Sequence, residues 1–394
     1  MTGQPLRAAG SAAPGLVQWA AFALGLVLVL ATWMSVIGTL IVPRPILSRI
    51  SKYSGLGTIQ IFALICRPLH GYRARDRVLA WQAPMSLFLR LVTWVALFDL
   101  SYALMLLPFE HGDAGAAFTE SGSALFTLGY AAPSHPSSTA IVYVAAFSGL
   151  VVVALQIGYL PTLYSAFNRR EAEVTLLVSR AGAPAWGPEL LARTRFGLST
   201  LDGTAELAEL YRTWERWAAE VAESHSTYLT LCWLRSPHPE ANWLISLLSV
   251  MDSAALQLSL SPSIVPALRA RLLIRMGFSC LNQIAQATGL AVVEDADPDS
   301  EIALSFDDFA EAVVMLRSVG YPVEVSAEQA WPHFRGWRVN YEPVLYALAR
   351  MIDAPPALWS GPRRWEATPL PPHRPANRVP SDSRGDDPQL LRPA

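Results

Sequence analysis

Two long stretches without a charged residue set the strongest constraint on how this 394-residue chain folds. No Asp, Glu, Lys or Arg occurs between Arg7 and Arg44, or between Glu120 and Arg169. The hydrocarbon core of a bilayer takes roughly 20 apolar residues as a helix, so each stretch is long enough to cross it. Because 52% of all residues are also hydrophobic, the chain is expected to be an integral membrane protein.

Three hydrophobic segments have the length and composition of membrane-spanning helices, and they cover residues 16–42, 84–108 and 138–167. The first is too long for the hydrophobic part of a cleaved signal peptide, which takes about 7–15 residues, so it is expected to span. A further apolar stretch, residues 55–66, is too short to span. It is expected to lie along the membrane surface or to pack on a neighbouring helix.

The distribution of basic residues predicts the orientation in the membrane. The loop at 46–83 and the segment after Phe167 carry clusters of arginine, whereas residues 109–137 contain neither Lys nor Arg. Because positively charged loops stay on the cytoplasmic side, the N-terminus is predicted outside and the C-terminal half inside. Lys52 is the only lysine beside many arginines, a bias typical of GC-rich bacterial genomes.

Composition changes after the third span, where charged residues and tryptophans become frequent. Residues 205–224 carry large apolar side chains at three- and four-residue spacing, which is the pattern of an amphipathic helix. Residues 264–288 and 306–319 also predict helices, and no Gly-rich signature of a nucleotide-binding fold occurs. Residues 171–365 are therefore predicted to form an all-α cytoplasmic domain.

One run within this domain permits two interpretations. Residues 241–268 contain a single charge, Asp252, but they are rich in serine and include two prolines. They form either a buried helix pair of the soluble domain or a fourth membrane span. At the ends of the chain, residues 1–15 are predicted to be an N-terminal tail, and residues 366–394, rich in Pro, Arg, Ser and Asp, a disordered tail.

The polar residues offer no recognised catalytic or metal-binding pattern. Cys66, Cys232 and Cys280 are widely spaced, and the seven histidines lack the spacing of metal ligands. The acidic run at 295–301 lacks the glycine and the final glutamate of a calcium-binding loop. A net charge of -2 gives no reason to expect a nucleic-acid partner. No enzyme activity, cofactor or resident metal is therefore expected.

A short predicted helix at 114–126 and the sequence Thr127-Leu128-Gly129-Tyr130 lie between the second and third spans. A span, a short outer helix, a glycine-containing segment and a second span make the layout of a pore loop. An ion that crosses the bilayer exchanges its water for other oxygens, which consecutive backbone carbonyls can supply. Glycine permits the positive φ angle that alternating carbonyl directions require.

Over about residues 84–170 the sequence resembles the potassium channel superfamily, whose selectivity filter is written T-V-G-Y-G-D. The residues that correspond to this filter are Thr127, Leu128, Gly129, Tyr130 and Ala131. The second glycine of the motif is replaced by Ala131, and its aspartate by Ala132. The resemblance implies a homotetrameric channel for a monovalent cation, K+ or Na+, with a re-entrant pore helix and filter at residues 114–133.

The third span holds the candidates for a gate. Gly149 lies at the distance from the filter glycine where the superfamily often places an inner-helix hinge, and Gly158 and Pro161 follow. Close packing at small residues is the alternative interpretation of the glycines. Gln156 is a candidate pore-lining residue, or else a partner in an interhelical hydrogen bond. Asp99, inside the second span, is expected to make a polar contact with the pore helix or an adjacent span.

The expected fold is therefore an all-α membrane protein with three transmembrane helices, a re-entrant pore helix and filter loop, and an all-α cytoplasmic domain. The expected function is a tetrameric pore-loop channel for monovalent cations in the bacterial cytoplasmic membrane. The alternative, which the two alanines favour, is a non-conducting channel-like scaffold that anchors the helical domain. The lipid bilayer and further copies of the chain are the expected partners.

Overall fold

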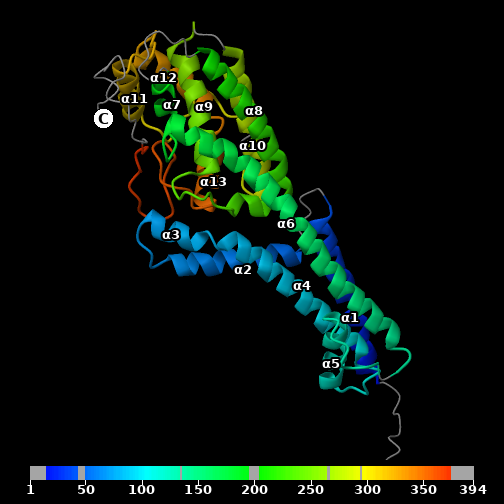
Figure 1. The fold of residues 1–394 in the computed structure, drawn as a ribbon. Coiled ribbons are helices and arrows are strands. Elements are labelled where there is room, and N and C mark those ends of the chain that lie inside the picture. Colours follow the sequence, from blue (N-terminus) through cyan, green and yellow to red (C-terminus); the bar gives the residue numbers. More distant parts are fainter. Residues whose placement is uncertain are drawn as a thin grey trace, which may run out of the picture. The chain divides into compact units, whose positions relative to one another are not determined.

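The computed structural model describes residues 15–42, 49–133, 135–194, 204–263, 267–292 and 295–373 (Figure 1). Within these ranges every regular element is a helix, and the only β-type pairings are two isolated bridges. The predicted all-α class is confirmed for this part of the chain. The predicted N-terminal tail, apart from its last residue, lies outside the described residues.

The chain divides into two compact units. Unit 1 comprises the described residues up to Ala63 and those from Pro84 to Thr162, and unit 2 comprises Leu64–Ala83 and the described residues from Leu163 onward. The second unit thus begins before the predicted boundary at residue 171, and it includes the later part of the basic loop, Leu64–Ala83.

Unit 1 is built from long apolar helices and one short helix. Its helices are α1 (Leu16–Leu40), most of α2 (Arg49–Cys66) and α4 (Gln82–Leu106), α5 (Ala114–Leu125) and the first part of α6 (Thr139–Ala181). The three predicted spans therefore fall on α1, α4 and α6. The last of these continues past the predicted end at residue 167 and contributes its final turns to unit 2.

Small and polar side chains lie between the helices of unit 1. A side chain added at Gly25 of α1 would come within 2.5 Å of the carbonyl oxygen of Ser101 on α4, so the two backbones approach closely there. Trp94 Nε1 donates to Ser35 Oγ at 3.0 Å across the same pair of helices. Close approach at small residues and buried interhelical hydrogen bonds are typical of helices that pack within a bilayer.

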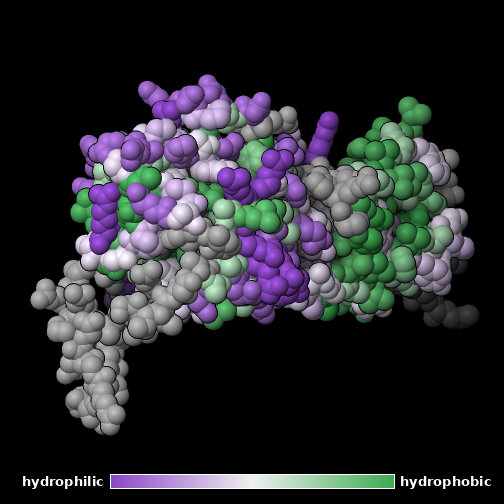
Figure 2. Space-filling view, turned by 90° about the horizontal axis from the view of Figure 1, so that it is seen from above, coloured by the Kyte–Doolittle hydropathy of each residue, from purple (hydrophilic) through white to green (hydrophobic). Residues whose placement is uncertain are grey.

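Burial separates three of the long apolar helices from a fourth. Four segments are long and apolar enough to cross a membrane: α1, Tyr72–Leu106, α6 and α9 (Trp243–Leu260). In the apolar stretches of the first three only 28%, 33% and 33% of residues are buried, against 94% in α9. Figure 2 shows a broad hydrophobic area on one part of the surface and a mostly hydrophilic remainder. These apolar helices indicate a membrane-embedded protein.

Unit 2 is a bundle with α9 at its centre. Besides α9 it contains α3 (Tyr72–Leu79), α7 (Gly187–Ala192), α8 (Thr204–Thr227), α10 (Ala267–Thr288), α11 (Phe306–Ser318), α12 (Ala327–Arg338) and α13 (Glu342–Met351). Helices α7, α8, α10, α12 and α13 all contact α9. The run at 241–268 therefore contains the core helix of this bundle, because α9 leaves almost no surface for lipid.

The start of the C-terminal tail corrects one expectation. Residues 366–373 were predicted to be disordered, but the amide of Leu370 donates to the carbonyl of Pro356 at 2.5 Å and that of His373 to Ala183 at 3.0 Å. These backbone hydrogen bonds hold the segment against unit 2, although its composition is that of a disordered chain. The rest of the predicted tail, residues 374–394, lies outside the described residues.

A buried guanidinium organises the core of unit 2. Arg338, at the end of α12, contacts the carboxylate of Asp252 on α9 at 2.6 Å and that of Glu342 on α13 at 2.9 Å. Its Nη2 group donates to the hydroxyl of Tyr346 and the carbonyl of Trp359. All three charged groups are buried. Opposite charge and several hydrogen bonds offset the high cost of removing these groups from water.

Replacing Arg338 with methionine is expected to lower the free energy of unfolding by about 3–5 kcal/mol, because two buried carboxylates would lose their counter-charge. Arg335 on the same helix, which pairs with the exposed Asp299, provides the matched control. Arg335→Gln should cost less than about 1 kcal/mol. Denaturant unfolding of the purified full chain, followed by tryptophan fluorescence, measures both. Equal losses would contradict the assigned role of Arg338.

Candidate pore loop

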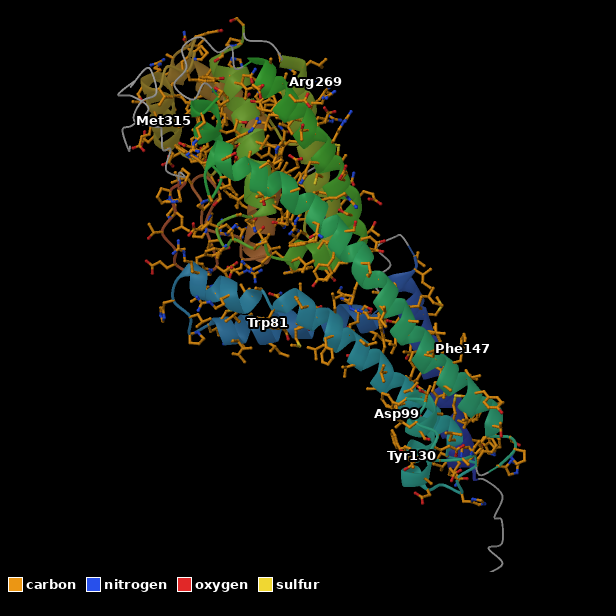
Figure 3. The ribbon with its side chains drawn as sticks, in the orientation of Figure 1. Trp81, Asp99, Tyr130, Phe147, Arg269 and Met315 are labelled. Atoms are coloured by element: carbon orange, nitrogen blue, oxygen red, sulfur yellow. The ribbon has the colours of Figure 1, made fainter. Side chains whose placement is uncertain are left out.

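Helix α5 begins at a well-formed cap and is fastened to α4. The carboxylate of Asp113 accepts from the amides of Gly115 and Ala116 at 2.8 and 3.2 Å, which satisfies two free donors of the first turn. Ser121 donates to the side-chain and backbone oxygens of Asp99 at 2.8 and 2.9 Å. The predicted polar contact between Asp99 and the short helix is therefore confirmed, and Figure 3 shows Asp99 beside that helix.

The backbone after α5 adopts a left-handed conformation at alternate residues. Thr127 has a φ angle of 54° and Gly129 one of 70°. Glycine reaches such angles without cost, but a β-branched threonine does so only under strain. Strained backbone of this kind persists where the surroundings enforce it, and it concentrates at functional sites. Positive φ was expected at Gly129 from its residue type, whereas the positive φ of Thr127 was not expected.

Ser123, in the last turn of α5, accepts hydrogen bonds from backbone amides of the loop that follows. Its carbonyl accepts from the amides of Leu128 and Gly129 at 2.8 and 3.4 Å, and its hydroxyl accepts from the amide of Ala131 at 3.0 Å. The carbonyls of residues 127–130 accept no hydrogen bond from the described part of the chain. The amides of Leu128, Gly129 and Ala131 therefore point toward α5, and the carbonyls of residues 127–130 have no donor among the described residues.

Exposure of the loop is high for its composition. Leu128 and Tyr130, two large apolar side chains, are 64% and 66% exposed, and Thr127 and Gly129 are exposed as well. Figure 3 places Tyr130 at the loop that follows α5. Exposed apolar patches of this kind occur at sites of protein, membrane or ligand interaction.

The left-handed alternation does not extend to Ala131. Among the described non-glycine residues only His111, Thr127, Asp353 and Trp359 have positive φ angles. An alanine that follows Tyr130 can either adopt the strained left-handed conformation or keep φ negative. The backbone takes the unstrained course at Ala131.

Helix α6 packs against the end of α5 through Gly149. A Cβ atom at this position would lie 1.9 Å from the carbonyl oxygen of Leu125, so no other residue fits. Close packing thus accounts for Gly149, whereas Gly158 has no atom within 4 Å of its would-be Cβ. Pro161 lies within the continuous helix and does not end it. Gln156, the candidate pore-lining residue, is 7% exposed in the single chain.

The exposed side of α6 carries a regular apolar stripe. Its members recur at three-, four- and seven-residue intervals and so lie on one face of the helix. They are Tyr143, Phe147, Leu150, Ile157 and Tyr164. Figure 3 labels Phe147 on this helix. A repeat that averages 3.5 residues is the spacing used where helices pack along their length against other helices.

The end of α6 is anchored in unit 2 by a buried arginine. Arg170 donates to the carboxylate of Glu171, to the ring nitrogen Nε2 of His225 at 3.0 Å and to the carbonyls of Leu231 and Leu234 at 2.8 and 2.7 Å. Its own carbonyl accepts from Trp217 Nε1 at 3.1 Å. The continuous helix α6 therefore contributes both Gly149, which packs against α5, and Arg170, which is a core residue of unit 2.

His225 is held neutral by this arrangement. A guanidinium only donates, so Nε2 is the acceptor and the ring proton sits on Nδ1, which lies 3.1 Å from the hydroxyl of Ser224. Complete burial and the adjacent positive charge of Arg170 lower the pKa of His225 well below its ordinary value. The folded protein therefore keeps this histidine neutral at a pH where an exposed histidine would bind a proton.

Replacing Gly149 with alanine is expected to cost about 1–3 kcal/mol of stability, because the added methyl group overlaps the Leu125 carbonyl. Gly158→Ala on the same helix should be neutral or stabilising, since nothing lies near its Cβ and alanine favours helix. Thermal unfolding midpoints of the detergent-solubilised variants test the pair. Indistinguishable midpoints would refute the close contact between α5 and α6.

Acid should destabilise the protein through His225. Below about pH 6.5 the unfolded histidine binds a proton while the folded one does not, so stability falls with decreasing pH by up to about 1.4 kcal/mol per unit. His225→Gln retains an acceptor for Arg170 but does not titrate. The difference in unfolding free energy between the two proteins, measured from pH 7.5 to 5, should therefore depend on pH. A constant difference would contradict the assigned protonation state.

The structure brings together some of the residues singled out in the sequence and separates others. Thr127–Tyr130 form one exposed loop braced by α5, and Gly149 supports that helix, while Gly158 and Pro161 lie farther along α6. The role of Ser123 in holding the loop was not predicted. The only sequence feature that could have indicated it is a hydroxyl side chain in the last helical turn before the motif. Comparison of the chain with family models, curated proteins and solved structures found no match.

Proposed function

We propose that the chain forms a homotetrameric pore-loop channel for monovalent cations, in which residues 127–130 provide the ion pathway. The observation that carries this proposal is the loop geometry: alternating left-handed residues, donors fastened to α5 and a run of carbonyls without a donor. Such carbonyls replace the water shell of a cation. Irregular backbone within a membrane protein is tolerated where it lines a cavity or is buried in protein.

The assembly follows from incomplete surfaces on a single chain. One loop cannot enclose an axis, and a closed ring requires several copies related by rotation. The exposed apolar side chains of the loop and the stripe on α6 supply surfaces for those copies. In the proposed arrangement α1, α4 and α6 span the bilayer, α5 is re-entrant, and α9 stays in a cytoplasmic unit 2.

Selectivity between potassium and sodium is proposed to be poor. Ala131 lacks the left-handed conformation, so the row of carbonyls ends at Tyr130 and contains fewer consecutive sites than the full motif provides. Unit 2 is proposed to regulate the pore, because the helix that supports α5 through Gly149 also contributes Arg170 to the core of unit 2. Movement of that end would be transmitted along a rigid element.

A second candidate is a non-conducting scaffold that holds unit 2 at the membrane. Ala131 and Ala132, which replace the second glycine and the aspartate of the motif, favour it. Ion flux through the purified protein in liposomes separates the two functions. Absence of flux under any cation gradient would leave the scaffold as the better account.

Replacing Gly129 with valine is expected to abolish cation flux, because a β-branched residue cannot adopt a φ of 70° without severe strain. Assembly, measured by the mass of the detergent-solubilised particle, should be unchanged. Replacing Ala131 with glycine and Ala132 with aspartate should raise the preference for potassium, measured as the reversal potential under bi-ionic conditions. Val314→Ala, at an exposed position of α11, is the control. Parental currents in Gly129→Val would refute a pathway through this loop.

A further inference from the structure

Helix α2 exposes a row of large apolar side chains and buries two hydroxyl groups. Ser51 and Thr58 are 3% and 2% exposed, so hydroxyl side chains point inward. The large apolar side chains that face outward are Tyr53, Leu56, Ile61, Leu64 and Ile65. This distribution is stable only where the surroundings of the helix are themselves apolar.

The start of α2 is fixed to the end of the first apolar helix. Ser51 Oγ lies 2.8 Å from Thr39 Oγ1 and 3.3 Å from Ser35 Oγ, both in the last turns of α1. Helix α2 is not among the segments apolar enough to cross a membrane. A helix that follows a span directly and does not itself cross stays at the surface where that span ends.

The charges around α2 are of one sign. No Asp or Glu precedes Asp76 in the sequence. Arg49, Lys52 and Arg67 are exposed, and in the described part of the chain none of them has an acidic partner. They differ in this from Arg73 and Arg75, which pair with Glu240 and Asp353. The free cations flank the apolar face at both ends of the helix.

A tryptophan marks the same membrane surface from the other side of the loop. Trp81 immediately precedes α4, the next long apolar helix, and its ring is largely exposed (Figure 3). If α1 and α4 each cross once, the end of α1 and the start of α4 lie at one face of the bilayer. Tryptophan is enriched at the level of lipid headgroups, where one edge of the ring meets water.

We infer that α2 is an interfacial helix that binds anionic phospholipid: its apolar face enters the boundary between headgroups and acyl chains, and Arg49, Lys52 and Arg67 contact the phosphate groups. The occupant is a lipid surface because the helix is attached to the end of a span and combines an exposed apolar face with uncompensated positive charge. This inference does not depend on ion conduction, and it would hold equally for a scaffold.

The depth of the helix is tested with a spin label in the full chain. The three native cysteines are buried, so a cysteine introduced at Ile61 is labelled selectively. In bilayers of phosphatidylglycerol and phosphatidylcholine the label should lie about 5–10 Å below the phosphates, where it collides with oxygen and not with a water-soluble nickel chelate. A label at Val314, exposed on α11, should show the opposite response.

Two outcomes at position 61 would overturn the proposal. Collision with the nickel chelate would place the helix in water. Protection from both oxygen and nickel would mean that protein covers this face, and the occupant would then be a second copy of the chain.

The charge of the lipid is tested by counting bound phosphatidylglycerol and phosphatidylcholine per chain by native mass spectrometry. Replacing Arg49, Lys52 and Arg67 with glutamine should weaken phosphatidylglycerol binding by about fivefold for each residue removed, with phosphatidylcholine unchanged. Replacing three arginines of unit 2, the exposed Arg212 and Arg216 and the partly exposed Arg269, is the control and should have no effect. Equal phosphatidylglycerol binding by the two triple variants would refute the inferred headgroup site.

Discussion

A polar group within a bilayer has no water to bond with, and most of unit 1 follows from this constraint. Trp94 is satisfied by Ser35, and Tyr102 lies 2.6 Å from the hydroxyl of Ser148. Asp99, a costly residue in an apolar helix, accepts from Ser121. Each bond joins two different helices, so satisfying the polar groups also fixes how the helices pack. The carbonyls of the loop after α5 are the exception, which is why the proposed ion pathway is placed there.

The same helix meets two environments in succession. The first part of α6 exposes aromatic and aliphatic side chains along one stripe, and it approaches α5 so closely that only Gly149 fits. Its last turns carry Arg170, whose charge would be very costly in lipid but is fully bonded in the core of unit 2. The one helix therefore contributes residues to both units.

The loop illustrates how far a motif can be interpreted. Positive φ at Gly129 was expected from the residue type, since glycine alone adopts it freely. Positive φ at Thr127 was not, because a β-branched residue disfavours it locally; the amides of the next two residues donate to the carbonyl of Ser123 and hold the loop in this course. Ala131 left two conformations open, and tertiary structure selected the unstrained one. Gln156 lies inside although its residue type and spacing allowed either side.

The sequence by itself determined the helical class, the positions of α1, α4, α5 and α6, and the apolar character of the N-terminal half. These properties follow from local causes: hydrophobic length, helical spacing and the cap at Asp113. Only the tertiary structure decided that α9, of similar composition, is the core of a bundle, since the side of a helix that is covered depends on distant residues such as Arg338. For the same reason it alone revealed that α2 buries Ser51 and Thr58 and exposes large apolar side chains such as Ile61.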